Sequence, residues 1–272
     1  MKAQKLIYLA LILACFLPSL AVRAQILDPN MNGGNVFPKA HSAGKKPVPL
    51  YHLREADVMW SKKVWRRIDL RQKFNHPYYY PVSPIENRKS LFEVLKRGII
   101  EYGSIIAYDP GPLGDNDDFT IPLSAEQVNN ILVSYDTIPS ENPLTGEMDL
   151  IPVKTEISSA DVIMYEVKEQ WFFDKQRSTM GVRIIGICPI IEKRDELTGD
   201  IRGTMRLFWV YFPEARYELV NEEAFNRFNG VRLTYDDMFT KRMFDSYIIK
   251  EDNIYDRTIG EYKAGLDALL EA

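Results

Sequence analysis

Few side chains in this 272-residue chain have the type and spacing that catalysis needs. Histidine occurs only as His41, His52 and His76, and none stands in the HxH, HxxxH or HExxH spacing that brings two imidazoles to one zinc ion. The chain also lacks the GxSxG, GxxxxGK[ST] and GxGxxG motifs of nucleophile elbows, phosphate loops and dinucleotide loops. We therefore expect no enzyme, although carboxylate pairs that folding brings together remain an open alternative.

Cysteine and clustered acids offer two further kinds of chemistry. Cys188 lies in an isoleucine-rich run, where a thiol is usually an inert part of the core. The run Asp109–Asp118 contains four acids and resembles a calcium loop, but counted from Asp115 the sixth position is Thr120 instead of glycine, although Glu126 fits the twelfth. We expect an inert thiol and a solvated turn, with no cofactor and no metal ion.

Residues 53–81 are rich in the side chains that proteins use to bind one another. Tryptophan and arginine are enriched in the buried centres of interfaces, because they bury a large area with little loss of rotamer freedom. The first group of candidate interface residues is Trp60, Trp65, Arg66 and Arg71. A second group, further along the chain, is Trp171 and Phe173. The alternative is that the tryptophans belong to the domain's own core.

An amphipathic helix is the element expected to carry the first group. Val58, Ser61, Trp65 and Ile68 follow the spacing of one helical face. The charged residues between them fit a solvated face, and we expect this helix to end near Asn75.

The stretch from Ile157 to Val220 predicts an antiparallel β-meander. Apolar and polar residues alternate in its first part, and we expect turns at Lys175–Ser178 and Glu196–Gly203 before a third strand, Thr204–Phe212. Pro189 cannot donate a backbone hydrogen bond, so we expect its strand at a sheet edge or a bulge.

Helices are expected on both sides of this meander in the sequence. Arg88–Glu101 places leucine and isoleucine side chains on one face. Two capping boxes, in which the first side chain bonds the backbone at the helix start and the second bonds back, predict helices after Ser124 with Gln127 and after Thr234 with Asp237.

The last predicted helix carries an apolar stripe, which predicts first of all a part of the core. The stripe consists of Ile259, Tyr262, Leu266 and Leu269, and small residues beside it would also permit another helix to approach closely. Together these elements predict an α+β fold, with N-terminal helices packed on a C-terminal antiparallel β-meander in a single main domain over residues 51–272.

The first 24 residues predict an export signal. Lys2 and Lys5 precede an apolar stretch, and residues 22–24 form a small-residue cleavage site before Gln25. A lipoprotein signal acylated at Cys15 is the alternative, which the apolar residues beyond this cysteine disfavour. Cleavage leaves 31 of the 34 basic residues and all 38 acids, a net charge of −7, so charge gives no reason to expect nucleic-acid binding.

Residues 25–50 predict an extended or mobile N-terminal arm. The segment is rich in asparagine, glycine and proline and has no apolar periodicity. Such an arm could be handed to a neighbouring subunit.

Two stretches resemble one known family. READVMWSKKVWRRIDLRQK, from Arg54, followed by YYYP, and EQWFFDKQRSTMGVRIIGICPI, from Glu169 to Ile190, are similar to the GldN/PorN proteins of gliding bacteria, periplasmic components of the type IX secretion system. The resemblance implies a non-enzymatic subunit that assembles with an outer-membrane lipoprotein of the GldK/PorK type into a ring at the inner face of the outer membrane. It also implies self-association within the ring and contact with an inner-membrane-anchored subunit of the GldM/PorM type.

A function of another class remains open beside this one. The chain could be a soluble periplasmic ligand-binding domain whose aromatic sheet face forms a groove. The two functions predict different surfaces. In an interaction subunit the aromatics would lie exposed on a flat or convex surface, whereas a binding module would bury them around a concave pocket with convergent polar groups.

Overall fold

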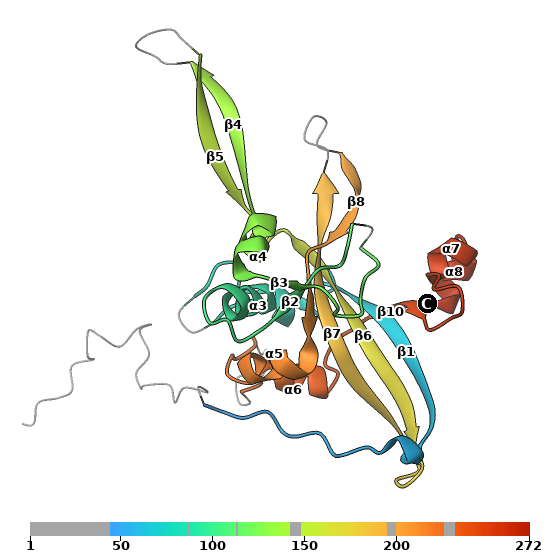
Figure 1. Cartoon of the computed structure of the whole chain (residues 1–272). Coiled ribbons are helices and arrows are strands. Elements are labelled where there is room, and N and C mark those ends of the chain that lie inside the picture. The colour runs from blue at the N-terminus through green and yellow to red at the C-terminus, as the bar shows by residue number, and fades with distance from the viewer. Residues whose placement is uncertain (1–43, 86–87, 113, 142–147, 195–199, 226–231) are drawn as a thin grey trace, which may run out of the picture. The chain divides into compact units, whose positions relative to one another are not determined.

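An antiparallel sheet is the central element of the fold (Figure 1). Its strands follow the order β10-β1-β6-β7-β9-β2-β3, and β8 pairs with β7 beside this path. The strands of this sheet are β1 (Val58–Asp69), β2 (Ala107–Tyr108), β3 (Pro122–Leu123), β6 (Val162–Asp174), β7 (Thr179–Arg194), β8 (Ile201–Arg206), β9 (Trp209–Tyr211) and β10 (Tyr247–Glu251). A separate hairpin of β4 (Val133–Glu141) and β5 (Met148–Glu156) extends from the end of a helix.

The computed structural model describes residues 44–85, 88–112, 114–141, 148–194, 200–225 and 232–272. The expected signal, the Cys15 lipidation site and residues 25–43 of the expected arm lie outside them, as do residues 196–199 of the expected turn at 196–203, while residues 201–203 of that turn belong to β8. In the part of the chain that is described, no helix combines the length and the apolar character needed to cross a membrane.

The helices confirm both capping boxes. Ser124 accepts a hydrogen bond from the backbone of Gln127, whose side chain accepts one in return, and Thr234 with Asp237 repeats this arrangement. The helical elements are the 3₁₀ turn η1 (Glu55–Asp57), α2 (His76–Tyr79), α3 (Leu91–Ile100), α4 (Ala125–Leu132), α5 (Phe212–Leu219), α6 (Tyr235–Thr240), α7 (Ile259–Tyr262) and α8 (Leu266–Glu271). Helices and a large antiparallel sheet together confirm the α+β class.

The helix predicted from residue 58 to near residue 75 is wrong, because residues 58–69 form β1. This strand pairs with β6 along its length and with β10 on its other side. Val64 and Trp65 are neighbours in sequence and both are buried, so both faces of the strand are covered. A strand covered on both faces has no strict alternation of apolar and polar residues, and here the apolar positions fell into a helical spacing by coincidence.

The register divides the side chains of the sheet between two faces. Ile68 lies on the face that packs against the helices, and with Val167 and Ile187 it belongs to the main core. Trp65 lies on the opposite face, in a smaller cluster with Cys188 and Trp209, beneath Phe119 from the loop between β2 and β3.

The meander is confirmed in part. β6 and β7 form the predicted hairpin around residues 175–178, but the expected third strand is divided between β8 and β9 and ends where α5 begins. The placement of Pro189 at an edge or a bulge is wrong. Pro189 lies inside the sheet, at the point where the neighbour of β7 changes from β9, which pairs with Ile187, to β8, which pairs with Ile190. At this change of neighbour the strand tolerates a residue that has no backbone N–H to donate.

The interpretation of the C-terminal stripe as core is also wrong. Of its four residues only Ile259 is buried, while Tyr262, Leu266 and Leu269 are exposed. Lys263 has an extended backbone and Gly265 adopts φ 62°, so α7 ends at Tyr262 and α8 begins at Leu266 as two short helices instead of one.

Cys188 is fully buried, and this burial raises the pKa of its thiol well above the ordinary value. Because the thiolate is the reactive form, we expect folded protein of residues 25–272, whose one cysteine is Cys188, to show no reaction with a thiol reagent such as Ellman's reagent. After unfolding in guanidinium chloride, one equivalent should react. Rapid labelling of the folded protein would contradict an inert role.

Candidate protein interface

An apolar row crosses three strands at one end of the sheet. Trp60 of β1 is the partner of Phe173 in β6, which is the partner of Met180 in β7, so the three side chains lie on one face. Trp60 is 47% exposed, Met180 is exposed and Phe173 is half-buried. We call these three residues the Trp60 row. They lie on the face that packs against the helices further along, at an end of the strands where that cover is incomplete.

Trp171 lies one row further along and is held in place by a buried charge. Its indole nitrogen donates a hydrogen bond to Glu169 (3.1 Å), and the guanidinium of Arg242 lies 5.4 Å from its ring. Arg242 also donates to Glu169 (2.7 Å), whose side chain is fully buried. These contacts fix Trp171 beside the Trp60 row and leave it half-buried.

Trp65 is placed in the interior, with 5% of its surface exposed. Its indole nitrogen donates to the carboxylate of Asp117, and the ammonium groups of Lys168 and Lys250 lie 5.4 and 4.4 Å from its ring centre. Lys168 also donates to the carbonyl of Asp117 (2.8 Å). Trp65 therefore joins the loop between β2 and β3 to the sheet.

The two arginines of the first group have partners within the chain. Arg66 donates to the hydroxyl (2.8 Å) and the carbonyl (2.9 Å) of Ser246, ahead of β10. Arg71 is exposed and pairs with Asp69 at 3.1 Å. Burial opposes ionisation of Asp69, but the hydrogen bonds from Arg71 outweigh it and lower the pKa of this carboxyl.

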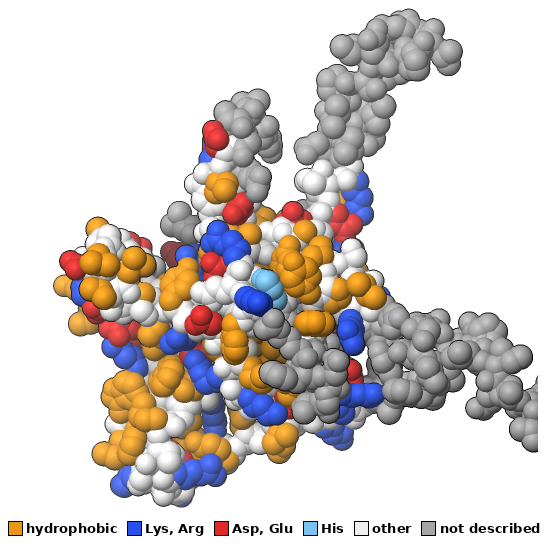
Figure 2. Space-filling view, turned by 180° about the vertical axis from the view of Figure 1, so that it is seen from behind, with side chains coloured by type: hydrophobic (Ala, Val, Ile, Leu, Met, Phe, Trp, Pro, Cys, Tyr) orange, Lys and Arg blue, Asp and Glu red, His pale blue; other side chains and the backbone are white. Residues whose placement is uncertain are grey.

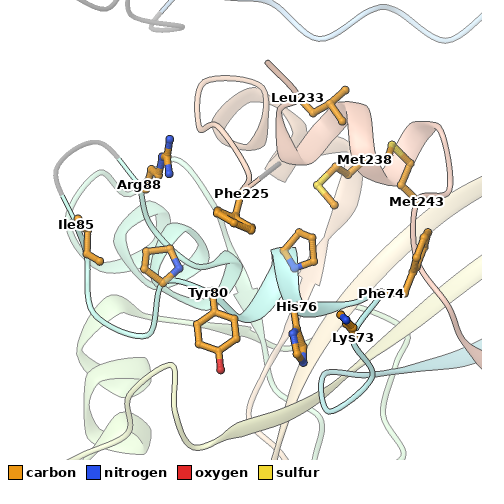
Figure 3. A pocket seen from close by; sticks show the side chains of 12 residues that line it. Lys73, Phe74, His76, Tyr80, Ile85, Arg88, Phe225, Leu233, Met238 and Met243 are labelled. Atoms are coloured by element: carbon orange, nitrogen blue, oxygen red, sulfur yellow. The ribbon is translucent and has the colours of Figure 1, made fainter. Parts of the chain in front are cut away.

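A second surface feature is an apolar groove of about 780 Å³, which contains none of the six predicted interface residues (Figure 3). One wall comes from α2 and its flanking residues, and the other from the segment leading into and out of α6. Its lining residues are Lys73, Phe74, His76, Pro77, Tyr80, Pro81, Ile85, Arg88, Phe225, Leu233, Met238 and Met243. Figure 2 shows hydrophobic side chains exposed on one face of the molecule, with basic and acidic side chains between them.

The groove has a one-sided charge. Figure 3 shows Arg88 near Ile85 at one end and Lys73 near Phe74 at the other. Among the described lining residues the ionisable groups other than tyrosine are Lys73, His76 and Arg88, and none is acidic. Such a surface suits an apolar occupant that carries negative charge. The sequence signal for it was the cluster of aromatics and prolines in FNHPYYYP, which follows no regular period.

The described residues contain no group of three or more His, Cys, Asp or Glu side chains that could hold a metal ion. The acidic run Asp109–Asp118 instead takes part in local turns and in the contacts of Asp117 with Trp65 and Lys168. Its role in the described structure is to close a loop over the sheet.

Comparison with known families finds one match. Residues 53–272 match the model of the family described as gliding motility associated protein GldN. This range begins before β1 and includes the Trp60 row, the groove and both C-terminal helices. No curated protein shows a significant match to the chain. Because the match covers most of the sequence, the chain belongs to the family of GldN, a protein associated with gliding motility and, through it, with type IX secretion.

Proposed function

We propose that this protein is a non-enzymatic structural subunit of the type IX secretion and gliding motility machinery. In this proposal it is exported to the periplasm and assembles there with an outer-membrane lipoprotein of the GldK/PorK type into a ring below the outer membrane. A GldM/PorM-like subunit anchored in the inner membrane is its further partner. Family membership supports the general role, and the exposed Trp60 row supports docking on a protein.

The Trp60 row has the composition and position of an interface centre. Tryptophan, phenylalanine and methionine are enriched in such centres, and here they lie side by side on paired strands. Covering the exposed half of Trp60, on the order of 100 Å², would contribute about 2.5 kcal/mol. Trp171, which Glu169 and Arg242 hold in place, provides a fixed neighbour and so reduces the entropy lost on docking.

A double variant of the Trp60 row tests this docking surface. We expect Trp60→Ser with Phe173→Ser to weaken binding of residues 25–272 to the lipoprotein by at least tenfold, since truncating central aromatics typically costs about 2 kcal/mol or more each. The measurement is light scattering coupled to size exclusion, with the protein coexpressed with the lipoprotein. Wild-type protein should form a large complex of defined mass.

The matched control is Tyr102→Ser with Ile106→Ser, which removes two exposed apolar side chains outside the row and should leave the complex intact. Circular dichroism should show that both double variants are folded. A Trp60-row variant that assembles like wild type would remove this surface from the proposal. A wild-type monomer that ignores the lipoprotein would contradict the proposed function itself.

One observation favours the ligand-binding alternative. The groove lies within the range of about 300 to 1,000 Å³ that is usual for small-molecule sites, although it is not formed by the aromatic sheet face expected for that alternative. Binding of a small apolar acid by a protein that stays monomeric beside the lipoprotein would support it.

A further inference from the structure

The C-terminal helix α8 exposes three leucines on one side. Leu266, Leu269 and Leu270 are 70%, 75% and 77% exposed. Their spacing of i, i+3 and i+4 is the pattern by which an amphipathic helix inserts into an apolar groove of a partner. Leucines this exposed are costly in a protein that stays alone in water, because each leaves a large apolar area hydrated.

The helix that carries these leucines is anchored to its own chain. The backbone nitrogen of Ile248 in β10 donates a hydrogen bond to the carbonyl of Ala272 (3.2 Å), and Lys263 pairs with Glu271 across the two short helices. Ile259 is buried and holds the beginning of the segment. These contacts present the leucines outward instead of folding them inward.

The same chain offers a groove that fits this helix in polarity. Phe74, Tyr80 and Phe225 line it and are themselves exposed, so apolar area is uncovered on both surfaces. An inserted turn of α8 would cover apolar area on both sides at once, which is the main source of affinity in helix-in-groove contacts.

Charge is complementary between the two surfaces. Lys73, His76 and Arg88 give the groove its basic margin, as described above. From Ile259 to Ala272 the chain carries Glu261, Asp267 and Glu271 against Lys263. In Figure 2, orange and red side chains lie together at the left, where the half-turn places α7 and α8. An acidic, leucine-bearing helix is thus the occupant that an apolar groove with a basic margin would favour.

We propose that residues 266–272 of one copy dock in the groove of a second copy of this chain. The inference rests on the proposed function, because it supplies the contact between subunits that a ring requires. The helix and the groove are different surfaces, so the contact is heterologous, and repeating it head to tail closes into a ring or continues as a filament. The leucines fill the groove, and Asp267 lies near its basic margin.

A mixed cross-link tests the contact directly. One variant carries Leu269→Cys, and a second carries Phe74→Cys. We expect a disulfide-linked dimer after mild oxidation of the mixture, and far less in either variant alone, because a heterologous contact brings residue 269 of one copy to residue 74 of the other. Wild-type protein serves as the control, since its buried Cys188 should not cross-link.

Sedimentation velocity over a range of concentrations gives the second readout. We expect Leu269→Asp to weaken self-association by at least tenfold, whereas Ile254→Asp, at a fully exposed position outside the leucine triad, should leave it unchanged. Lys73→Glu should also weaken it, and adding Asp267→Lys should restore part of the loss. This rescue is not expected if the variants act by unfolding.

Three results would overturn the inference. The mixture could give no cross-link, wild type could remain monomeric at all concentrations, or a chain carrying both cysteines could link internally at high dilution. Each variant is also coexpressed with the lipoprotein. Variants that still bind the lipoprotein but fail to associate with one another would leave the proposed function standing, whereas loss of lipoprotein binding by wild type would reject the function.

Discussion

Replacing Trp65 by alanine is expected to destabilise the fold of this protein strongly instead of merely releasing it from a partner. The indole is 95% buried, as its 5% exposure shows, and lies in the cluster with Cys188 and Trp209. Truncation of a buried aromatic costs about 3 to 5 kcal/mol, because transfer energy is lost and a cavity remains. That is a large share of the roughly 5 to 15 kcal/mol that usually separates folded from unfolded domains.

The polar contacts of Trp65 add to this loss. Asp117 would lose the indole donor, and Lys168 would lose the ring beneath its buried ammonium group. The loop between β2 and β3 would then be held to the sheet by fewer bonds. We expect Trp65→Phe to be intermediate, since it keeps an aromatic ring and loses only the N–H donor and part of the volume.

Urea denaturation of residues 25–272 measures this effect through the transition midpoint. Trp60→Ala is the matched control, because the same side chain is removed from a half-exposed position on the same strand, and its midpoint should shift far less. The structural assignment of Trp65 would be refuted by a variant that keeps the wild-type midpoint but no longer joins the complex. Trp65 would in that case belong to the interface.

Local chemistry explains which elements could be predicted from the sequence. Both capping boxes depend on residues three positions apart, so Ser124 with Gln127 and Thr234 with Asp237 were readable without tertiary information. β1 could not be assigned in this way. Its conformation depends on pairing with β6 and β10, which lie about 100 and 180 residues further along the chain. Because both faces of β1 are covered, its apolar and polar residues do not alternate.

The candidate site shows the same division between local and distant information. Residue type alone makes Trp60 and Phe173 candidates for an interface, but only the register reveals that they are partners on one face. The groove joins residues 73–88 to residues 225–243, and no local pattern connects these segments. The stripe that includes Leu266 and Leu269 predicts core because an apolar stripe looks the same in sequence whether its partner is in the chain or outside it.

Breaking the ion pair between Arg216 and Asp236 is expected to have an effect as large as the loss of Trp65. Arg216 of α5 donates to both carboxylate oxygens of Asp236 in α6, at 2.7 and 3.1 Å, and the two side chains are only 7% and 6% exposed. Removing one partner leaves the other charge buried without compensation, which costs about 3 to 5 kcal/mol. Arg216→Ala should therefore lower the free energy of unfolding by about this amount in urea denaturation.

Arg216 also anchors residues 44–50, the segment ahead of β1, which gives the prediction a second readout. Its guanidinium donates to the carbonyl of Val48 (2.8 Å), while Gly44 donates to the side chain of Asn221 (3.1 Å). In Arg216→Ala, we expect faster limited proteolysis between residues 44 and 50, because one of these two anchors is lost. The combination Arg216→Met with Asp236→Leu should recover most of the stability, since no buried charge is then left unpaired, but it should not recover the protection of Val48.

An exposed ion pair provides the matched control for this experiment. Lys62 and Glu251 join β1 to β10 at 2.7 Å, but both are partly open to water. Lys62→Ala should change the free energy of unfolding by less than about 1 kcal/mol. If Arg216→Ala were as mild as Lys62→Ala, the carboxylate of Asp236 must be reached by water once its partner is gone. The pair would then contribute to the path of the chain near Val48 and little to the stability of the core.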